Sequence, residues 1–306
     1  MAILFDEIGR PGEKDRKVVV KVAFDAESEE SILNEEQHLR SMQGSEHIVQ
    51  LLYSGPLGFH HRAIVIEYIE NGHWEDILER FIVGGQRIPN RILWGLFLCL
   101  TRAVIGMAWP QSTGASGQSH REQIREGPPR RLAHQDFSLQ NILVGEWNKD
   151  DPEHRFSPIT KVIDFGNAAV LPPEEGLGDY TGVADNIGEI GRVMLWLAIG
   201  HRGYEIDEVE VQDRPGLPMR VIESRSHYDL SDGSISDELR FLIHRCRAVD
   251  PAERPTLPEL LKICENAVLN HTAADYVDLN EPWPEFEHDE ALDWIIQRFI
   301  FDAPTF

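Results

Sequence analysis

The sequence is poor in cysteine and in basic residues, and both shortages limit what the protein can be. Its 306 residues include three cysteines, Cys99, Cys246 and Cys264, which are far apart and form no CxxC pair. A disulfide framework is therefore excluded, and a reducing compartment is expected. The sequence has 29 lysines and arginines against 52 aspartates and glutamates, a formal charge of −23. A field of that sign repels nucleic acid and anionic membranes, so neither is expected as a partner.

Long apolar runs and a secretion signal are also missing. The first residues, MAILFDEIGR, contain no basic region followed by an apolar stretch, so no signal peptide is expected. The most apolar segment, Ile92–Leu100, is too short to span a bilayer, and Arg102 follows it closely. The hydrophobic content of 42% is ordinary for a globular protein. We therefore expect a soluble, cytoplasmic protein with one large or two modest domains.

The first third of the chain has the pattern of strands with one helix. The β-branched run Val18–Ala23 follows a polar turn, GRPGEKDRK, and predicts a hairpin with Ile3–Phe5. Apolar positions at helical spacing predict a helix over 28–42. The apolar segment Ala63–Tyr68 predicts another strand, which ends at a Glu-Asn-Gly turn.

From residue 74 onward the pattern becomes helical. Helices are predicted at Trp74–Val83, from Pro89 to about Trp109, over Asp185–Gly200, at the end of Cys246–Leu261 and over Asp289–Phe299. Two polar stretches, 110–130 and 148–157, lack an apolar period, and we interpret them as insertions, the first as an exposed loop. Strands followed by helices predict an α+β chain.

The stretch with the most chemical information runs from His134 to Gly166 and reads HQDFSLQNILVG…KVIDFG. Asp136 is followed five residues later by Asn141, and Asp164 opens an Asp-Phe-Gly sequence after an apolar strand. Two carboxylates and an amide oxygen on neighbouring loops suit a site that holds a divalent metal and orients a hydroxyl. Each residue alone could be a turn cap, but three caps at this spacing are improbable.

Seven features follow one another in an order that resembles the protein-kinase superfamily, over about residues 3–265. They are Lys21 on an early strand, Glu35 on the next helix, the strand ending Ile66-Glu67-Tyr68, the HQD loop, the DFG sequence, a buried helix starting at Asp185, and Asp250-Pro251…Arg254-Pro255. The resemblance implies a two-lobed α+β fold. It places a small β-sheet lobe with one helix at 1–68, a larger, mainly helical lobe at 69–270, and an acidic C-terminal tail with a short helix at 271–306.

The resemblance also implies roles in catalysis with ATP and Mg²⁺. Lys21 corresponds to the lysine that contacts the α/β-phosphates, and Glu35 to the acid that pairs with it; Glu36 is the competing choice. Asp136 would orient the acceptor hydroxyl and accept its proton. Asn141 and Asp164 would bind the metal.

Further positions are assigned by the same resemblance. Ile66 would close the back of the adenine pocket, Glu67 and Ile69 would offer backbone contacts to adenine, and Leu143 would also contact ATP. Four residues would have structural roles: His134 and Phe165 would pack behind the loops, Asp185 would anchor the backbone of the HQD loop, and Arg254 would pair with an acid near Glu174.

The sequence departs from the family pattern at four places. It contains no G-x-G-x-x-G, and the GRPG stretch at Gly9–Gly12 lies too close to Lys21 to replace it, so the first strand and glycine loop are read as absent. Gln135 stands where an arginine is usual, and the segment from Asp164 to Glu174 is short. Ser138 stands where a lysine is expected, and losing a charge-stabilising donor costs roughly 2.7–4 kcal/mol. Arg130 and Arg131 are candidates to replace that cation.

These observations predict a phosphotransferase that uses Mg-ATP and acts on a protein serine or threonine hydroxyl. Two alternatives remain open at this point. The missing glycine loop and Ser138 favour a catalytically impaired kinase-like module that acts by binding a protein partner. The short segment after Asp164 favours a small-molecule phosphotransferase of the choline or aminoglycoside type.

Overall fold

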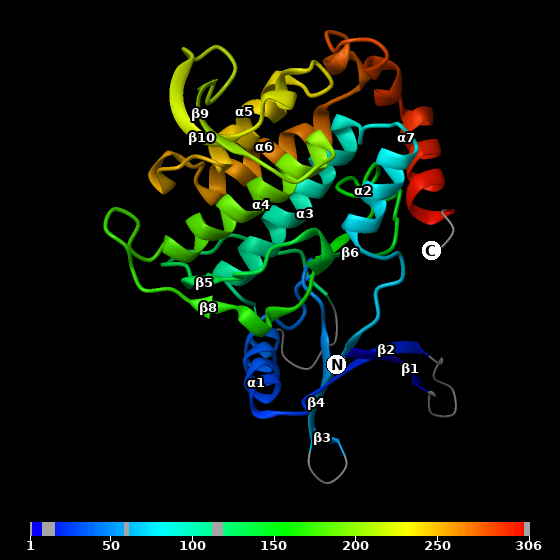
Figure 1. The fold of residues 1–306 in the computed structure, drawn as a ribbon, viewed down its shortest axis with the longest axis vertical. Coiled ribbons are helices and arrows are strands. Elements are labelled where there is room, and N and C mark those ends of the chain that lie inside the picture. Colours follow the sequence, from blue (N-terminus) through cyan, green and yellow to red (C-terminus); the bar gives the residue numbers. More distant parts are fainter. Residues whose placement is uncertain (1, 8–15, 58–60, 112–118, 303–306) are drawn as a thin grey trace.

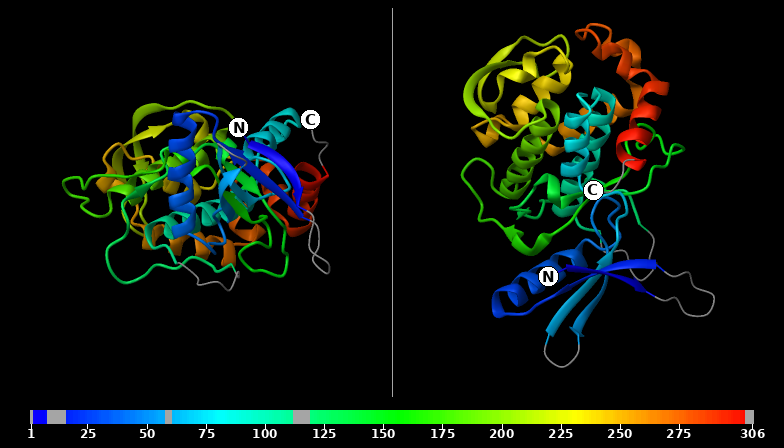
Figure 2. Two further views of the ribbon diagram at one scale, coloured as in Figure 1. Left: turned by 90° about the horizontal axis from the view of Figure 1, so that it is seen from below. Right: turned by 45° about the vertical axis from the view of Figure 1, so that its right-hand side comes forward.

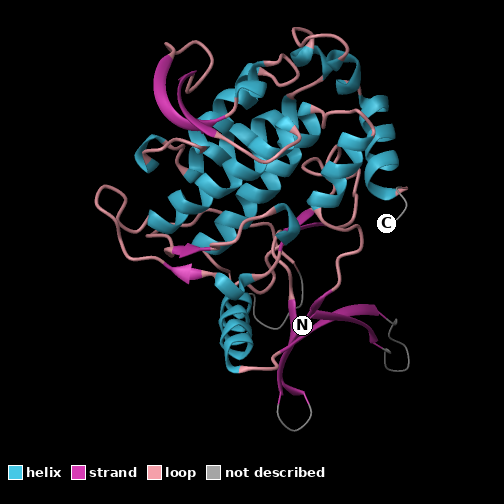
Figure 3. Ribbon diagram, viewed as in Figure 1, coloured by secondary structure: helices cyan, strands magenta, loops and turns pink. Residues whose placement is uncertain are grey.

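The computed structural model describes residues 2–7, 16–57, 61–111 and 119–302. Gly9–Gly12 and part of the first predicted insertion therefore lie outside the described residues. The chain is α+β, as predicted: a small N-terminal sheet is followed by a mainly helical portion (Figures 1 and 3). Figure 2 shows the sheet and the first helix at one end of the molecule and the other helices at the opposite end.

The N-terminal sheet has four antiparallel strands in the order β1-β2-β4-β3. Their bounds are Ala2–Glu7 for β1, Arg16–Val22 for β2, Leu51–Leu57 for β3 and His61–Glu67 for β4. The predicted N-terminal hairpin is therefore confirmed. Strand alternation buries Val18, Val20 and Val22 against Ala63 on one face of β2. The intervening residues, including Lys21, point to the other face.

Helix α1 (Ala26–Ser41) crosses beside this sheet. It begins at a capping box in which Asp25 accepts a hydrogen bond from the Ser28 amide at 2.8 Å and the Ser28 hydroxyl accepts one from the Asp25 amide. The cap fixes where the helix starts and therefore which residues face the sheet. Ile32, Glu35 and Leu39 are buried on that side.

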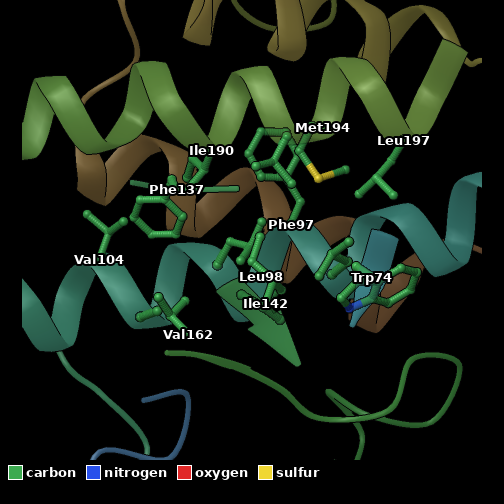
Figure 4. Packing of buried hydrophobic residues seen from close by; sticks show 14 of the residues in the cluster. Trp74, Phe97, Leu98, Val104, Phe137, Ile142, Val162, Ile190, Met194 and Leu197 are labelled. Carbon is green, nitrogen blue, oxygen red and sulfur yellow. The ribbon is translucent and has the colours of Figure 1, made fainter. Parts of the chain in front are cut away.

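The helical portion is built around α3 (Asn90–Ala108), which packs between α4 (Thr181–Ile199) and α6 (Leu257–Asn270). Side chains of α3 and α4, including Phe97 and Met194, fill the space between these two helices (Figure 4). The other helices are α2 (Trp74–Val83), α5 (Asp237–Cys246) and α7 (Asp289–Ile296). Short 3₁₀ helices lie at Leu139–Asn141, Phe165–Asn167, Tyr228–Ser231, Pro251–Glu253, Ala273–Tyr276 and Trp283–Glu287.

The apolar stretch of helix α3 is longer than Ile92–Leu100, the segment identified in the sequence. Its 19 residues are long and apolar enough to cross a membrane by length and composition alone. Every residue of its most apolar window is buried inside the protein, however, and the core helix of a globular protein passes the same test. The helix is therefore weak support for a membrane span.

Four short strands flank two loops of the helical portion. β5 (Leu132–Ala133) pairs with β8 (Ala169–Val170), and β6 (Ile142–Val144) pairs with β7 (Thr160–Val162). A separate hairpin of β9 (Glu205–Val211) and β10 (Arg220–Ser226) packs on α5. We did not predict that hairpin or α5, although the alternation in EIDEVEV is a usable strand signal.

The described part of the first polar insertion is not simply an exposed loop, which corrects the prediction, and the second insertion is also partly buried. Glu122 is 1% exposed and Glu153 is 7% exposed. Arg121 of the first insertion forms ion pairs with Asp151 and Glu153 of the second, at 2.5 and 3.2 Å. Polar residues that satisfy one another in this way can be buried without an apolar period in the sequence.

The C-terminal segment packs on the helical portion. A π-helical turn, Gln297–Phe301, follows α7. Phe299 in this turn stacks on Phe81 of α2 with ring centroids 4.6 Å apart, and Arg80 donates a hydrogen bond to the Phe299 carbonyl at 3.2 Å. The segment therefore stays beside α2 (Figure 1).

Candidate active site

Two strand pairs bring the two polar loops of the sequence together. β5 precedes and β6 follows the loop with Asp136 and Asn141, while β7 precedes and β8 follows the loop with Asp164. Because β5 pairs with β8 and β6 pairs with β7, both ends of one loop are fixed to both ends of the other. The carboxylates of the HQD and DFG sequences are therefore held on neighbouring backbones.

Lys21 extends from β2 towards the second of these loops. Its Nζ lies 2.8 Å from both carboxylate oxygens of Glu35 on α1 and 2.9 Å from Oδ1 of Asp164. The Lys21 side chain is 17% exposed and that of Glu35 is 2% exposed. Burial alone lowers the pKa of Lys21, but the two carboxylates outweigh it and raise the pKa above its ordinary value. The lysine therefore stays charged in the cleft.

Glu36, the competing partner for Lys21, binds elsewhere. It forms ion pairs with Arg40 and Arg62 and accepts a hydrogen bond from Ser54. Burial alone would raise its pKa, but these hydrogen bonds lower the pKa of Glu36 to about 2. The structure thus pairs Lys21 with Glu35, the residue chosen from the sequence.

Asn141 and Asp136 are linked within the first loop. The Asn141 amide nitrogen donates to the carbonyl of Asp136 at 2.9 Å and to its carboxylate at 3.0 Å. This arrangement uses the nitrogen of the Asn141 side chain and leaves its oxygen as an acceptor. Asn141 and Asp164 together offer hard oxygen donors of the type that Mg²⁺ prefers, so the residues present fit that ion.

The backbone is strained at both loops. Among the described residues, two non-glycine residues have positive φ: Gln135 at 64° and Asp164 at 66°. A non-glycine residue in this region costs on the order of 1–3 kcal/mol and persists only where its surroundings hold it. Asp164 is itself one of the acids with predicted chemical roles, and Gln135 directly precedes the other, Asp136.

His134 bridges the loops from behind. Its Nε2 donates to the carbonyl of Ile163 at 3.0 Å, and its Nδ1 accepts from the amide of Asp136 at 3.3 Å. The ring is fully buried between Phe137 and Phe165. Burial lowers the pKa of His134 to about 4, so the ring is neutral near pH 7. The ring packs behind the two loops, as predicted, and does not act as a base.

Two structural assignments from the sequence are wrong. Asn186, one residue after the predicted Asp185, anchors the HQD loop by accepting from the amide of His134 at 3.0 Å. Asp185 instead accepts a hydrogen bond from the Gln135 side chain at 3.0 Å, because the helical turn directs the two neighbours differently.

Arg254 likewise does not pair with an acid near Glu174. It donates to the carbonyls of Ala184 and Ala248, at 2.7 and 3.2 Å, while Glu174 is exposed. Arginine satisfies backbone carbonyls at a crowded junction of this kind because its donors point in several directions.

A cavity of about 630 Å³ opens beside Lys21, a size typical of small-molecule sites. Its lining includes every residue predicted to contact ATP: Lys21, Ile66, Glu67, Ile69 and Leu143. Val19, Val49 and Ile163 add to its apolar wall. Ile300 and Phe301 of the C-terminal segment also line it, and nothing in the sequence pointed to them.

Three further residues near the site were not predicted from the sequence. Asn34 of α1 donates to the carbonyls of Gly166 and Ala168, at 3.0 and 2.8 Å, and so ties α1 to the DFG segment. Lys161 pairs with Glu67 at 2.6 Å. Arg192 of α4 donates to the Phe137 carbonyl at 2.8 Å, beside Ser138.

The arginines suggested as substitutes at Ser138 are bound elsewhere. Arg130 donates to the Ser41 hydroxyl at 2.8 Å. Arg131 pairs with Asp179 at 2.6 Å and donates to the Leu171 carbonyl at 2.8 Å. Neither therefore supplies the cation expected at Ser138 in this structure.

The chain is similar to protein kinases over part of its length, while no family model matches it. It is 27% identical over 205 residues to a membrane-associated tyrosine- and threonine-specific cdc2-inhibitory kinase of Drosophila melanogaster, covering 63% of this chain and 32% of that protein. It is 26% identical over 188 residues to a serine/threonine-protein kinase of Arabidopsis thaliana, covering 55% of this chain and 49% of that protein. It is also 26% identical over 157 residues to a probable serine/threonine-protein kinase of Thermomonospora curvata, covering 47% of this chain and 19% of that protein.

The chain thus spans about half or less of the length of the curated relatives it matches. The similarity is distant, but it agrees with the geometry of the two loops. Together they support a relationship to protein kinases and a kinase-like transferase at that coarse level.

Proposed function

We propose that the protein is a two-lobed, protein-kinase-like phosphotransferase that moves the γ-phosphoryl group of Mg-ATP to a serine or threonine hydroxyl of a protein. The observation that carries the proposal is the position of Lys21, held between Glu35 and Asp164 beside the cavity with the predicted ATP contacts. The proposed lobes are 1–68 and 69–270, followed by the tail 271–306. We further propose a cytoplasmic location and neither nucleic acid nor membrane as a partner.

Each residue has a defined task in this proposal. Lys21 holds the α/β-phosphates, and Asn141 and Asp164 hold Mg²⁺, which neutralises charge on the phosphates when bound. Asp136 orients the acceptor hydroxyl and takes its proton as the new O–P bond forms and the bond between the β- and γ-phosphates breaks, leaving ADP. Apolar residues of the cavity, with Ile66 at the back, enclose the adenine.

A binding module that lacks phosphotransfer is the second candidate. Ser138 offers no cation, and Arg130 and Arg131 are bound to Ser41 and Asp179. A site that binds nucleotide without this cation would lose roughly two to three powers of ten in rate, the equivalent of about 2.7–4 kcal/mol. Both candidates therefore allow nucleotide binding, and they differ in transfer.

Thermal unfolding with and without Mg-ATP tests the shared step. At a ligand concentration of 100 Kd a binder gains about 2.7 kcal/mol of stability. We expect that gain in the wild type, its loss in Asp164→Ala, and its retention in Asp185→Asn, a nearby acid outside the cavity lining. The absence of any magnesium-dependent gain in the wild type contradicts the phosphotransferase and leaves a module that acts by binding a protein partner.

Transfer from ATP labelled at the γ-phosphate separates the classes. Label on a generic protein substrate, lost in Asp136→Asn, supports the proposed kinase activity. Label on a small alcohol or amine alone supports the small-molecule alternative instead. Nucleotide binding with no transfer to either acceptor supports the binding module.

A further inference from the structure

A second group of reactive side chains lies away from the candidate active site. His47, Cys99 and His154 are 0%, 1% and 3% exposed. They come from three distant segments: the connection between α1 and β3, the middle of α3, and the second polar insertion. The Cys99 sulfur and one ring nitrogen of each histidine all lie within 4.8 Å of one another. The fold thus gathers one thiol and two imidazoles in the interior.

A buried carboxylate orients one of the histidines. Nδ1 of His47 donates to Glu122 at 2.7 Å, and the other carboxylate oxygen of Glu122 accepts from the His47 amide at 2.8 Å. Glu122 is 1% exposed. A carboxylate that binds one imidazole nitrogen fixes the ring and leaves the other nitrogen as a lone-pair donor, which is how metal-binding histidines are usually held.

One ring nitrogen of each histidine lacks a partner. Within the described residues, Nε2 of His47 and Nε2 of His154 are buried and have no hydrogen-bond partner. Buried polar atoms are rarely left in this state, because each forfeits its hydration without compensation. The sulfur of Cys99 contacts Nδ1 of His154 at 3.9 Å. Together with the unpartnered Nε2 of His47, these two atoms point to a ligand that accepts nitrogen and sulfur lone pairs.

We propose that His47, Cys99 and His154 bind a metal ion of intermediate softness, Zn²⁺ foremost, with Glu122 positioning His47. Tetrahedral zinc with ordinary Zn–S and Zn–N bonds places sulfur and nitrogen roughly 3.5 Å apart. The Cys99 sulfur lies 3.9 Å from Nδ1 of His154, so binding requires only a small movement. Glu46 and Asp151 form a separate group with His154 and pair with Arg121, so the three side chains of the proposed site are His47, Cys99 and His154.

Charge favours a divalent ion at this place. A Cys99 thiolate and the Glu122 carboxylate together carry two negative charges, which Zn²⁺ neutralises inside the protein. Sulfur and imidazole ligands select zinc over Mg²⁺, which prefers oxygen. The site is therefore chemically distinct from the proposed magnesium position at Asp164 and does not depend on the proposed activity.

The site connects three segments that are far apart in the sequence. The carbonyl of His47 accepts from the amide of Val162 at 2.9 Å, and Val162 ends the strand that leads to Asp164. A metal bound to His47 would thus fix the connection after α1 to α3 and to the second insertion. Its expected effect is structural, with a stabilising influence on the DFG loop.

Metal analysis of the purified full-length chain tests the proposal. After zinc loading and removal of free metal, we expect about one zinc per wild-type chain and per Cys264→Ala chain, a matched buried cysteine outside the cluster. Cys99→Ala and His154→Asn should retain no stoichiometric zinc, and chelation should lower the Tm of the wild type but not of these two variants.

A spectroscopic measurement on the wild type keeps the test valid if the variants fail to fold. X-ray absorption at the zinc edge should show one sulfur and at least two nitrogen ligands, and exchange with Co²⁺ should produce a thiolate-to-cobalt charge-transfer band. Zinc without a sulfur ligand, or a wild-type chain that takes up no zinc, overturns the proposal.

Discussion

Glu35 and Glu36 are neighbours on α1, yet the structure gives them unrelated surroundings. Glu35 faces Lys21 in the interior, with both carboxylate oxygens 2.8 Å from Nζ. Glu36 faces Arg62 and Arg40 at the rim of the sheet. A helix turns by about 100° per residue, so adjacent positions point to different partners. The pair provides a matched comparison for the role of Lys21.

Substitution of these two residues should affect different properties. Glu35→Gln removes the charge that holds Lys21, and we expect the Kd for Mg-ATP to rise at least tenfold, about 1.4 kcal/mol. Glu36→Gln should lower the midpoint of urea unfolding with an unchanged Kd. Calorimetric titration and chemical denaturation of both variants measure the two quantities. An equal loss of nucleotide affinity in both would contradict the assignment of Lys21.

His134 makes stability depend on pH in a defined window. Its pKa is about 4 in the folded chain against an ordinary 6.5, so the unfolded state binds more protons between these values. The free energy of unfolding should therefore fall as pH drops from about 6.5 to 4 and level off below. The full effect is roughly 3 kcal/mol. The ionisable groups around the ring are Asp136, Asp164 and Lys21.

The variant His134→Gln isolates this contribution. It cannot gain a proton, so its unfolding free energy should vary less steeply with pH than that of the wild type between pH 6.5 and 4. Urea titrations at half-unit pH steps measure the difference, and the remaining titrating groups are common to both proteins. Parallel pH profiles would show that the ring is not held neutral by burial.

At the scale of elements, α1 and the DFG segment behave as one unit. Asn34 donates to the carbonyls of Gly166 and Ala168 from the α1 side. A Cβ on Gly166 would lie 2.4 Å from Oγ of Ser31, closer than side-chain atoms tolerate. The approach of α1 at Ser31 therefore favours glycine at this position, because a larger residue forces the serine side chain to shift. The helix that places Glu35 is the same helix that restricts the loop of Asp164.

A double-mutant cycle tests this contact. Gly166→Ala should destabilise the protein by roughly 1–3 kcal/mol through overpacking. Ser31→Ala removes the colliding hydroxyl, so the double variant should recover much of that loss. Chemical denaturation of all four proteins gives the coupling energy, expected at about 0.5–3 kcal/mol. If the two substitutions have additive effects on the free energy of unfolding, the steric conflict at Gly166 does not involve the Ser31 hydroxyl.

The sequence predicts the elements well where local pattern decides them. Helix α2 has the predicted bounds, Trp74–Val83, because its apolar spacing and its polar borders agree. The pairing of Lys21 with Glu35 was implied by the resemblance to protein kinases, with Glu36 as the competing choice, and the structure shows the ion pair with Glu35. The anchor of the HQD loop was misplaced by one residue, since Asp185 and Asn186 are neighbours in the second turn of α4 and only the tertiary contact separates them.

Long-range polar contacts explain what the sequence could not show. Glu122 lies in a stretch without apolar period, and its burial depends on His47, 75 residues away. No local pattern records such a pairing. For the same reason, the sequence did not predict that Ile300 and Phe301 line the cavity. Their contact with it depends on the path of the chain through the whole helical portion.

At the scale of the whole molecule, the two ends of the chain meet at the cavity. Ala2 of β1 and Ile300 and Phe301 of the C-terminal segment all line it. Phe301 also stacks on Trp147, with ring centroids 5.8 Å apart, next to the second insertion. The C-terminal segment is thus part of the cavity wall, and ligand binding and packing of the segment should influence each other.

The variant Ile300→Ala tests this coupling, since Ile300 is 3% exposed and contributes to the wall. Truncating a buried isoleucine costs about 2–5 kcal/mol of stability, and here we expect a weaker affinity for Mg-ATP as well. Val277→Ala, at a position 65% exposed, is the control that should change neither. Hydrogen exchange gives a second measure, because Mg-ATP should protect the amides of 297–301 as it protects those around Lys21. Protection at Lys21 with none at 297–301 would show that nucleotide binding does not order the C-terminal segment.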